Sequence, residues 1–402
     1  MPDAEPRGTP PRPSKPSSPG TPPRPSPPPS PSTPRPTPLL GVHERLGATM
    51  TGFAGWQMPL RYRSETAEHH AVRRAAGLFD LSHMGEISVT GPGAGGALDY
   101  ALTGQPSAVA PGRARYTMIC ADDGGVLDDL IVYRLVDQEF LIVANAANTQ
   151  VVQDALAQRA DGYDAQVTDR TADYALIAIQ GPAAAKILGP LTDISLDGVK
   201  YYASHRARVS GREALLARTG YTGEDGFELF TAPGDAEHVW TALADAGSGD
   251  GLVPAGLAAR DTLRLEAGMP LYGNELGPDV TPFDAGLGRV VKFDKPGDFV
   301  GRAALQAYAE AGPRRVLVGL TGATRRVPRH GYAVLWHGQA RGTVTSGAPS
   351  PTLGVPIAMA YVDPEMARLA AAGGAGGALA VDIRGSAEPA TMVDLPFYRR
   401  AD

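Results

Sequence analysis

The proline content of the N-terminal segment sets the strongest limit on what this chain can fold into. Of the first 38 residues, 17 are proline, and few of the others carry an apolar side chain. Proline has a fixed φ and no backbone N–H, so such a segment cannot form helix interiors or sheet ladders. We therefore predict that residues 1–38 are disordered, partly as polyproline II, and that the folded chain begins at Leu39. A passive tail is favoured over a docking segment for an SH3-like partner.

Beyond Leu39 the hydrophobic pattern alternates between short strands and helices. Residues 64–77 are predicted to form a helix that is capped by Ser64 and stopped by Gly77. The stretches "VLDDLIVYRL" (126–135) and "EFLIVANA" (139–146) are predicted to form a hairpin. Alternation of this kind, interrupted by hairpins, indicates an α+β fold rather than a doubly wound sheet.

The chain changes character near its C-terminal end. From residue 314 to 395 the sequence has short strand patterns, many glycines and hardly any helical periodicity. This pattern is typical of a small β-rich domain. We therefore expect a folded region over 39–310 and a separate β domain over 311–402.

Charge, cysteine content and hydropathy exclude several classes of protein. The formal net charge is −6, and because the first 38 residues carry +3, the remainder carries −9. Such a body is a poor match to nucleic acid, which is usually bound by a basic face. The single cysteine, Cys120, permits no intrachain disulfide and no multi-cysteine zinc site. No apolar run approaches the roughly 20 residues of a membrane span, so we expect a cytoplasmic protein without a membrane partner.

Two motifs that could indicate a cofactor are rejected. "GPGAGG" (91–96) has the glycine spacing of a dinucleotide fingerprint, but the strand before it is half polar and no acidic residue lies about 20 positions further on. We predict a tight turn and a helix start there instead. His69, His70 and His83 lack the spacing of a metal site such as H-x-x-x-H, so no metal is expected.

Asp128 and Asp129 stand side by side in the apolar run "VLDDLIVYRL". Neighbouring side chains on a strand face opposite ways, and both faces of this run are otherwise apolar. At least one carboxylate is therefore expected to be partly buried, which is costly unless it is paired or hydrogen-bonded. Two interpretations stay open: a structural aspartate that binds backbone amides near the "DDGG" turn, or a carboxylate held for a polar ligand.

Two further stretches contain candidate ligand-binding residues. In "RTGYTGEDGFELF" (218–230), glycines surround Tyr221, and Glu228 re-enters a strand between bulky apolar neighbours, where alternation favours a solvent-facing side chain. In "GLAARDTLRLEAGMPLYGNEL" (256–276), Arg260 and Arg264 share a helix face. These arginines could grip a carboxylate ligand or could form an internal salt-bridge network, and the sequence favours neither.

Eight of these motifs, in order along the chain, resemble the aminomethyltransferase family, the T-proteins of the glycine cleavage system. The resemblance covers the chain from about residue 39 to its end. The motifs are "FAGWQMPLRY" (53–62), "LFDLSHMGEI" (78–87), "GGVLDDLIVY" (124–133), "VANAAN" (143–148), "RTGYTGEDGFEL" (218–229), "PAGLAARDTLRLEAGMPLYG" (254–273), "VTSGAPSPTLG" (344–354) and "PFYR" (396–399).

The resemblance implies a fold and a reaction. It implies two α+β lobes over residues 39–310 and a C-terminal β-barrel-like domain over 311–402, arranged as a clover-leaf around a central cavity that binds tetrahydrofolate. It implies an enzyme that takes the aminomethyl group from the lipoyl arm of the H-protein. Ammonia is released, and 5,10-methylenetetrahydrofolate and the dihydrolipoyl carrier are formed.

The resemblance also assigns roles to individual residues. The family's acidic catalytic position falls on Asp129, which would stabilise positive charge near the folate nitrogens or assist proton movement. The pterin-binding glutamate falls on Glu228, which reverses the solvent-facing interpretation above. Other cavity positions of the family fall on Tyr116, Asn145, Tyr221, Arg260, Met84 and, at the C-terminal end, Arg399.

Relatives with other activities share this fold. A flavin-dependent demethylating oxidase would need an additional dinucleotide domain, for which residues 39–402 leave no room. The folate proteins linked to iron–sulfur assembly carry a "KGC-x-x-GQE"-type stretch, whereas the only cysteine here lies in "MICADDGG". A folate-dependent demethylase and a folate-binding scaffold without turnover remain as alternatives.

Overall fold

The computed structural model describes residues 33–370 and 379–400, so most of the proline-rich segment lies outside the described residues. The described chain nevertheless contradicts the predicted start of folding at Leu39. Strand β1 (Arg35–Pro36) pairs in parallel with β3 (Trp56–Arg61), and Thr37 is buried with its hydroxyl donating to Asp80. Proline is tolerated here because β1 is the edge strand of its sheet.

A five-stranded antiparallel sheet forms the first lobe. The predicted hairpin is confirmed as its second and third strands. Helices α3 (Ala94–Ala101) and α4 (Thr149–Arg159) share a buried cluster with one face of this sheet. In spatial order the strands are β6 (Arg113–Cys120), β7 (Val126–Val136), β8 (Glu139–Ala144), β5 (Gly85–Thr90) and β9 (Gln166–Asp169).

The rejected fingerprint "GPGAGG" lies where β5 leads into α3. Gly91 has φ +117°, and a side chain there would meet the backbone oxygen of Asp164 at 2.6 Å. The segment is thus a tight turn against the neighbouring backbone, followed by the first residue of α3 at Ala94. This agrees with the prediction of a turn and a helix start.

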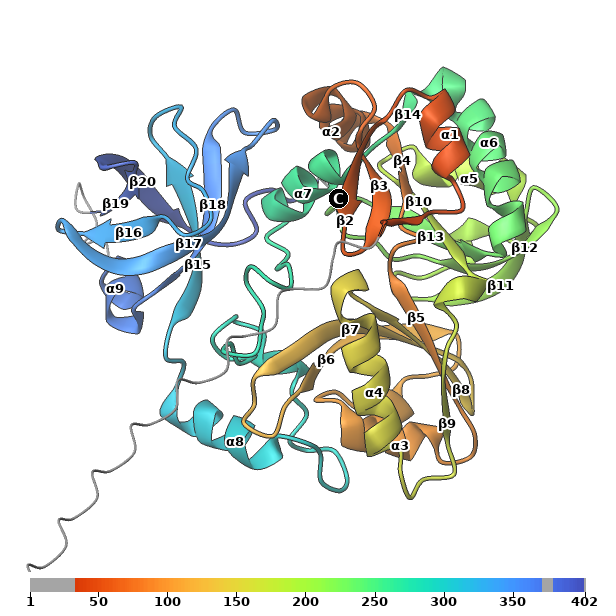
Figure 1. Ribbon diagram of the computed structural model, residues 1–402, viewed down its shortest axis with the longest axis horizontal. Helices are drawn as coiled ribbons and strands as arrows, with labels where there is room; N and C mark the ends of the chain where they lie inside the picture. The colour runs from red at the N-terminus through yellow and green to blue at the C-terminus, as the bar shows by residue number, and fades with distance from the viewer. Residues whose placement is uncertain (1–32, 371–378, 401–402) are drawn as a thin grey trace, which may run out of the picture. The chain divides into compact units, whose positions relative to one another are not determined.

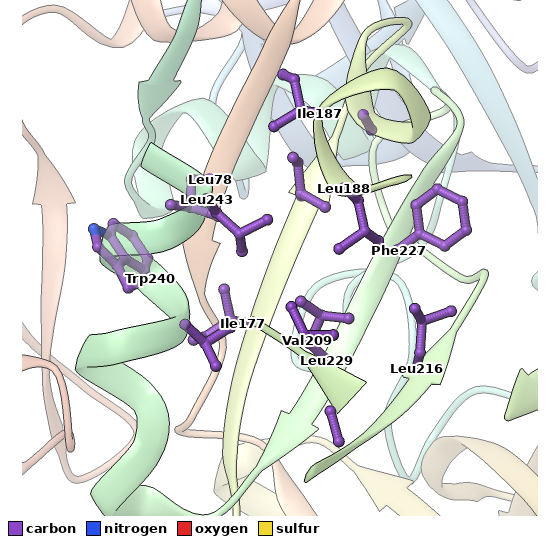
Figure 2. Close-up of a cluster of buried hydrophobic side chains, with 14 of the residues drawn as sticks. Leu78, Ile177, Ile187, Leu188, Val209, Leu216, Phe227, Leu229, Trp240 and Leu243 are labelled. Atoms are coloured by element: carbon purple, nitrogen blue, oxygen red, sulfur yellow. The ribbon is translucent and has the colours of Figure 1, made fainter. Parts of the chain in front are cut away.

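A six-stranded mixed sheet forms the second lobe, and helices α5 (Ala184–Leu188) and α6 (Ala236–Gly247) cover one of its faces (Figure 1). Figure 2 shows the apolar cluster between them, in which Trp240 and Leu243 of α6 lie with side chains from five strands of the sheet. The strands are, in spatial order, β11 (Ser204–Val209), β12 (Arg212–Ala217), β13 (Gly226–Thr231), β10 (Ala175–Gln180), β4 (Ala76–Asp80) and β14 (Leu252–Pro254).

Helix α2 (Glu65–Arg74) begins as predicted but ends early. Ser64 accepts a hydrogen bond from the N–H of Ala67 at 3.4 Å, as an N-cap should. The helix stops at Arg74, and Gly77, the predicted stop, already lies in β4. A side chain at Gly77 would meet Cγ2 of Val72 at 2.4 Å, so this glycine allows close packing of α2 on the sheet.

The remaining elements of the two lobes complete the buried core. The opposite face of the second sheet shares an apolar cluster with the first sheet, with α2 and with α7. The additional helices and strands are α1 (Leu40–Arg45), β2 (Thr49–Phe53), α7 (Leu257–Glu266) and α8 (Arg302–Ala311).

The predicted C-terminal β domain is confirmed as a closed six-stranded barrel, drawn in blue in Figure 1. Its interior is filled by a separate apolar cluster, and α9 (Pro364–Leu369) packs against that cluster. Around the barrel the strands are β15 (Val316–Gly322), β18 (Pro356–Val362), β17 (Gln339–Pro349), β16 (Ala333–Trp336), β19 (Leu379–Ile383) and β20 (Ser386–Val393).

No helix within 33–370 or 379–400 is long and apolar enough to cross a membrane.

Candidate active site

Strand β7 is covered on both faces, so both members of the aspartate pair are taken into the protein. Leu130 and Val132 lie in the cluster beneath α3 and α4, and Asp128, on the same face, has no exposed surface. Ile131 and Tyr133 lie on the other face, in the cluster shared by the two sheets. Asp129 is on that second face, at the wall of a cavity.

The cavity has a volume of about 650 Å³, and all of its lining residues lie between Phe53 and Leu287. They come from both sheets, from the tip of the β2–β3 hairpin, from α7 and from the segment that follows α7. Most of the expected ligand-binding residues meet here. The predicted site residues that line the cavity are Met84, Tyr116, Asp129, Asn145, Tyr221, Glu228 and Arg260.

Arg399 is the exception among the expected site residues. It is exposed, and it is not among the residues that line the cavity. Its neighbour Tyr398 packs over the guanidinium of Arg73, with 4.0 Å between the guanidinium carbon and the ring centroid. The C-terminal segment therefore contacts the buried polar network described below rather than the cavity, and the placement of Arg399 gives no support to a ligand-binding role.

The Asp129 carboxylate is held by two donors. Its Oδ1 accepts a hydrogen bond from Nδ2 of Asn145 at 2.8 Å, and its Oδ2 accepts one from the hydroxyl of Tyr116 at 3.0 Å. Burial raises the pKa of Asp129, and these two hydrogen bonds oppose that effect. A carboxylate fixed in this way, in a largely apolar cavity, is suited to stabilising a positive charge on a ligand.

Asp128 does not bind the "DDGG" turn, which was one interpretation of the pair. Its partners are Asn145 and Asn148, in the segment between β8 and α4. Burial, together with the negative charge of Asp129, raises the pKa of Asp128 to about 7.

Glu228 faces the cavity, not solvent. Strand β13 is buried on both sides: Phe227 and Leu229 pack under α5 and α6, whereas Phe230, on the same face as Glu228, lies in the cluster shared by the two sheets. Simple alternation failed here because it assumes that one face of a strand is open to water. The hydroxyls of Thr219 and Tyr133 both donate to Oε2 of Glu228.

The two donors that hold Glu228 were missed by the sequence analysis. Tyr133 OH lies 3.2 Å from Oε2 of Glu228 and 3.0 Å from Oγ1 of Thr219. Tyr133 could have been found from its spacing, because it lies four residues after Asp129 on the same strand face. Thr219 carries no comparable signal, since its position depends on how the loop after β12 folds back.

Tyr221 and Arg260 form a second polar corner of the cavity. The Tyr221 hydroxyl donates to the backbone oxygen of Pro270, and the guanidinium carbon of Arg260 lies 4.8 Å from the centroid of the Tyr221 ring. No hydrogen bond or ion pair joins that guanidinium to another residue of the described chain. Arg260 can therefore contribute its positive charge to a ligand, although burial lowers its pKa.

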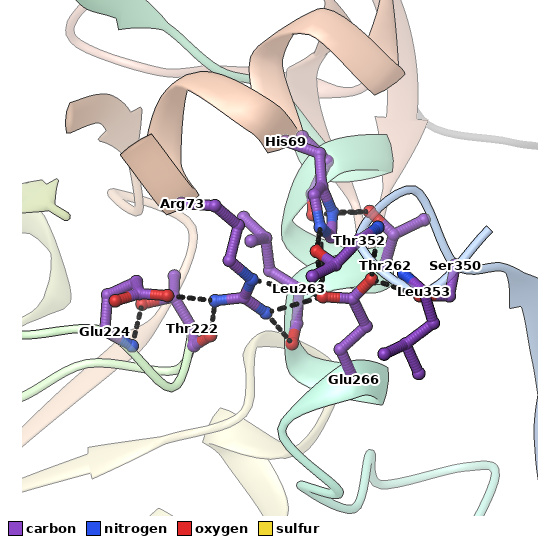
Figure 3. A network of polar contacts seen from close by, with 11 residues as sticks. His69, Arg73, Thr222, Glu224, Thr262, Leu263, Glu266, Ser350, Thr352 and Leu353 are labelled. Carbon is purple, nitrogen blue, oxygen red and sulfur yellow. Dashed lines mark hydrogen bonds and ion pairs between the residues drawn. The ribbon is translucent and has the colours of Figure 1, made fainter. Parts of the chain in front are cut away.

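The other charged residues of α7 form internal networks. An internal salt-bridge network was one of the two interpretations of the arginines in this helix. Arg264 binds Glu275 at 3.0 Å and the hydroxyl of Ser346 in the barrel at 2.8 Å. Figure 3 shows Arg73 of α2 lying between Glu224, at 2.8 Å, and Glu266, at 3.0 Å. Asp261 and Arg264 also line the cavity, but Arg264 is already paired with Glu275, whereas the Arg260 guanidinium is left for a ligand.

Two histidines, His69 and His83, also make structural contacts. Nε2 of His69 lies 3.0 Å from Glu266, and His83 stacks edge-on against Phe53 at the cavity wall. Among residues 33–370 and 379–400 there is no group of three or more His, Cys, Asp or Glu side chains that could hold a metal ion.

Family models identify the two parts of the fold. The model described as "GCVT N-terminal domain" matches residues 39–295, and that described as "Glycine cleavage T-protein C-terminal barrel domain" matches residues 315–399. The chain belongs to the glycine cleavage T-protein family. Proteins named aminomethyltransferase from Streptomyces avermitilis and Saccharopolyspora erythraea are 66% and 64% identical to it, over 91% of this chain and 98% of each relative.

A solved structure supports the same assignment. The crystal structure of glycine cleavage system aminomethyltransferase T from Bartonella henselae superposes with a TM-score of 0.83 and 36% sequence identity, over 90% of this chain and 98% of that one. The expected fold class, with its mixed α+β region and C-terminal barrel, is therefore confirmed, and the chain is a transferase of the aminomethyltransferase family.

Proposed function

We propose that this chain transfers the one-carbon unit of S-aminomethyl-dihydrolipoyl H-protein to tetrahydrofolate, in the cytoplasm. In this reaction the carbon leaves the lipoyl sulfur, the nitrogen is released as ammonia, and the products are 5,10-methylenetetrahydrofolate and the dihydrolipoyl carrier. The observation that carries the proposal is that one cavity of about 650 Å³ is lined by both Asp129 and Glu228. Its volume lies within the range typical of small-molecule sites.

Glu228 is proposed to bind the pterin ring of the folate. Both protein donors, Tyr133 and Thr219, contact Oε2, so Oε1 is left to accept hydrogen bonds from a ligand. A pterin offers a ring N–H and an exocyclic amine, which a fixed carboxylate can accept side by side. Tyr133 and Thr219 then act by fixing the direction of the Glu228 carboxylate.

Asp129 is proposed to act at the reacting carbon. As the carbon passes from sulfur to the folate nitrogens it develops iminium character, and a fixed negative charge lowers the energy of that positive centre. Hydrogen bonds from Tyr116 and Asn145 keep the carboxylate in one orientation, so little reorganisation is needed during the transfer.

The proposal is tested by measuring methylenetetrahydrofolate formation from tetrahydrofolate and aminomethylated, lipoylated H-protein. Asp129→Ala is expected to fold, to bind folate, and to lose at least about 100-fold in kcat. Glu228→Gln is expected chiefly to weaken folate binding measured by calorimetry, since one acceptor becomes a donor. Asp123→Asn, on the exposed β6–β7 turn, is the matched control and should keep the wild-type rate.

The alternatives give different results in the same assay. A scaffold without turnover would bind folate but form no methylenetetrahydrofolate. A demethylase would be inactive with aminomethylated H-protein and active with a methylamine or methyl ether donor. Wild-type turnover in Asp129→Ala would refute the role given to that residue.

A further inference from the structure

Asp128 lies on the face of β7 that points away from the cavity. It has no exposed surface and lies between apolar residues of the cluster beneath α3 and α4. A buried carboxylate in such a place is costly unless its oxygens accept hydrogen bonds. Its contacts therefore indicate what the residue does.

The Asp128 carboxylate accepts three hydrogen bonds, and all three donors are amides. Oδ1 accepts from Nδ2 of Asn145 at 2.9 Å and from Nδ2 of Asn148 at 2.7 Å. Oδ2 accepts from the backbone N–H of Asn145 at 2.9 Å. Asn145 is thus held at two points, its backbone and its side chain.

The Asn145 side chain joins the two carboxylates. Its Nδ2 carries two hydrogens, and its two carboxylate contacts are Oδ1 of Asp128 at 2.9 Å and Oδ1 of Asp129 at 2.8 Å. A turn of the amide by 180° would bring its oxygen against two carboxylates, which is repulsive. The two carboxylates together therefore select the amide orientation in which an N–H points at Asp129, and Asp128 fixes the position of that amide.

The orientation of Asp129 depends on this N–H. Asp129 has one side-chain donor for each oxygen, Asn145 for Oδ1 and Tyr116 for Oδ2. Loss of the Asn145 contact would leave the carboxylate free to rotate about its bond to Cβ. A rotation of this kind moves the negative charge relative to a ligand without closing the cavity.

We propose that Asp128 is a positioning residue for the reaction, acting through Asn145 on the direction of the Asp129 carboxylate. The inference rests on the proposed function for its kinetic consequence, but the geometry that it asserts can be examined without any turnover. The competing account is that Asp128 only anchors the segment 145–148 at the start of α4, in which case its loss lowers stability alone.

A double-mutant cycle separates these two accounts. Asp128→Asn keeps the shape of the side chain but removes at least one acceptor, and it is expected to lower kcat by up to about 100-fold while the KM for tetrahydrofolate changes by less than about threefold. Asn145→Ala is expected to lower kcat by a similar factor. Because Asp128 acts through Asn145, the double variant should be no slower than Asn145→Ala alone.

Asp284→Asn is the matched control for the loss of a buried acceptor. Asp284 is 1% exposed and accepts hydrogen bonds from the backbone N–H groups of Thr281 and Arg314, yet it does not line the cavity. It should lose stability with kcat unchanged. The proposal is overturned if Asp128→Asn behaves in the same way, or if the Asp128 and Asn145 effects on kcat multiply.

Crystal structures test the proposed geometry without any measurement of activity. In Asp128→Asn, the Asn145 amide is expected to move out of hydrogen-bond distance of Asp129; an unchanged contact overturns the proposal. If that variant does not fold, an atomic-resolution structure of the wild-type protein tests the proposal instead. An Asn145 amide oxygen that faces Asp129 would overturn the proposal. If the wild-type protein makes no methylenetetrahydrofolate but Asn145 moves as predicted in Asp128→Asn, the proposed function is refuted and the positioning role of Asp128 is not.

Discussion

At the residue scale, Glu86 is a buried acid without a partner. It lies on β5, is 1% exposed, and neither of its carboxyl oxygens has a hydrogen-bond partner among the described residues. Burial raises its pKa well above the ordinary glutamate value, and the negative charges of Asp169 and Glu228 add to the shift. We therefore expect Glu86 to keep its proton to a higher pH than an ordinary glutamate does.

This leads to a prediction about stability and pH. A folded-state pKa above the unfolded value means that the stabilising contribution is full below about pH 4.5 and is lost as the pH rises through the folded pKa. Glu86→Gln keeps the shape and cannot ionise. Its free energy of unfolding, measured with urea at several pH values, is expected to increase relative to wild type as the pH rises. Glu310→Gln, at an exposed position on α8, serves as the control. A difference in the free energy of unfolding between Glu86→Gln and wild type that stays constant with pH contradicts the prediction.

The residue scale also shows what the sequence could and could not reveal. Strand alternation correctly indicated a buried carboxylate at 128–129, because an apolar run on both faces of a strand is visible in the sequence. The same rule placed Glu228 in solvent, wrongly, because the cover on its face comes from another sheet. The resemblance to the family instead predicted that Glu228 binds the ligand, and Glu228 does line the cavity.

At the scale of elements, Arg73 links three segments that surround the cavity. From α2 it donates to the backbone oxygen of Thr222 at 2.7 Å and to Glu224, both in the loop that carries Tyr221. It also binds Glu266 at the end of α7, the helix that carries Arg260 (Figure 3). These side chains are at most 4% exposed. The network therefore holds the two segments that form the polar corner of Tyr221 and Arg260.

Replacing Arg73 by methionine is expected to be strongly destabilising. It leaves the buried carboxylates of Glu224 and Glu266 without their shared cation, which costs about 3–5 kcal/mol in the free energy of unfolding. Hydrogen exchange should rise in the loop 219–225 before it rises elsewhere. Arg45→Met removes an ion pair to Glu237 whose side chains are 60% and 61% exposed, and it should cost at most about 1 kcal/mol. Equal losses in the free energy of unfolding for the two substitutions would show that the buried network stabilises the fold no more than an exposed ion pair does.

The elements themselves were largely predictable, and their junctions were not. The predicted hairpin formed as strands β7 and β8, and α2 begins after its predicted cap, Ser64. The end of α2 was misplaced because Gly77 serves close packing on β4, a contact that local sequence does not contain. The hydroxyls of Ser350 and Thr352 donate to Glu266, more than 80 positions away in the chain, and no spacing rule predicts such pairs.

At the scale of the whole molecule, the folded body extends further toward the N-terminus than the proline count indicates. The guanidinium of Arg35 lies 4.3 Å from the ring of Trp56, and Thr37 is 4% exposed. The Thr37 hydroxyl donates to Asp80, which is itself 3% exposed and also binds His43. Composition alone missed these contacts because they depend on a strand and a carboxylate that lie far along the chain.

A comparison of two shortened chains tests this boundary. A chain that begins at residue 39 lacks β1 and the Thr37 donor, so it should be less stable than one that begins at residue 33, by about 2 kcal/mol for a lost hydrogen bond to a buried charge. For a chain of this size we expect a Tm lower by roughly 4 °C. In the longer chain, Thr37→Val removes only the hydroxyl and should account for most of the loss. If both chains melt at the same temperature, the contacts of residues 34–38 add no stability, and the predicted boundary at Leu39 is the better description of the folded body.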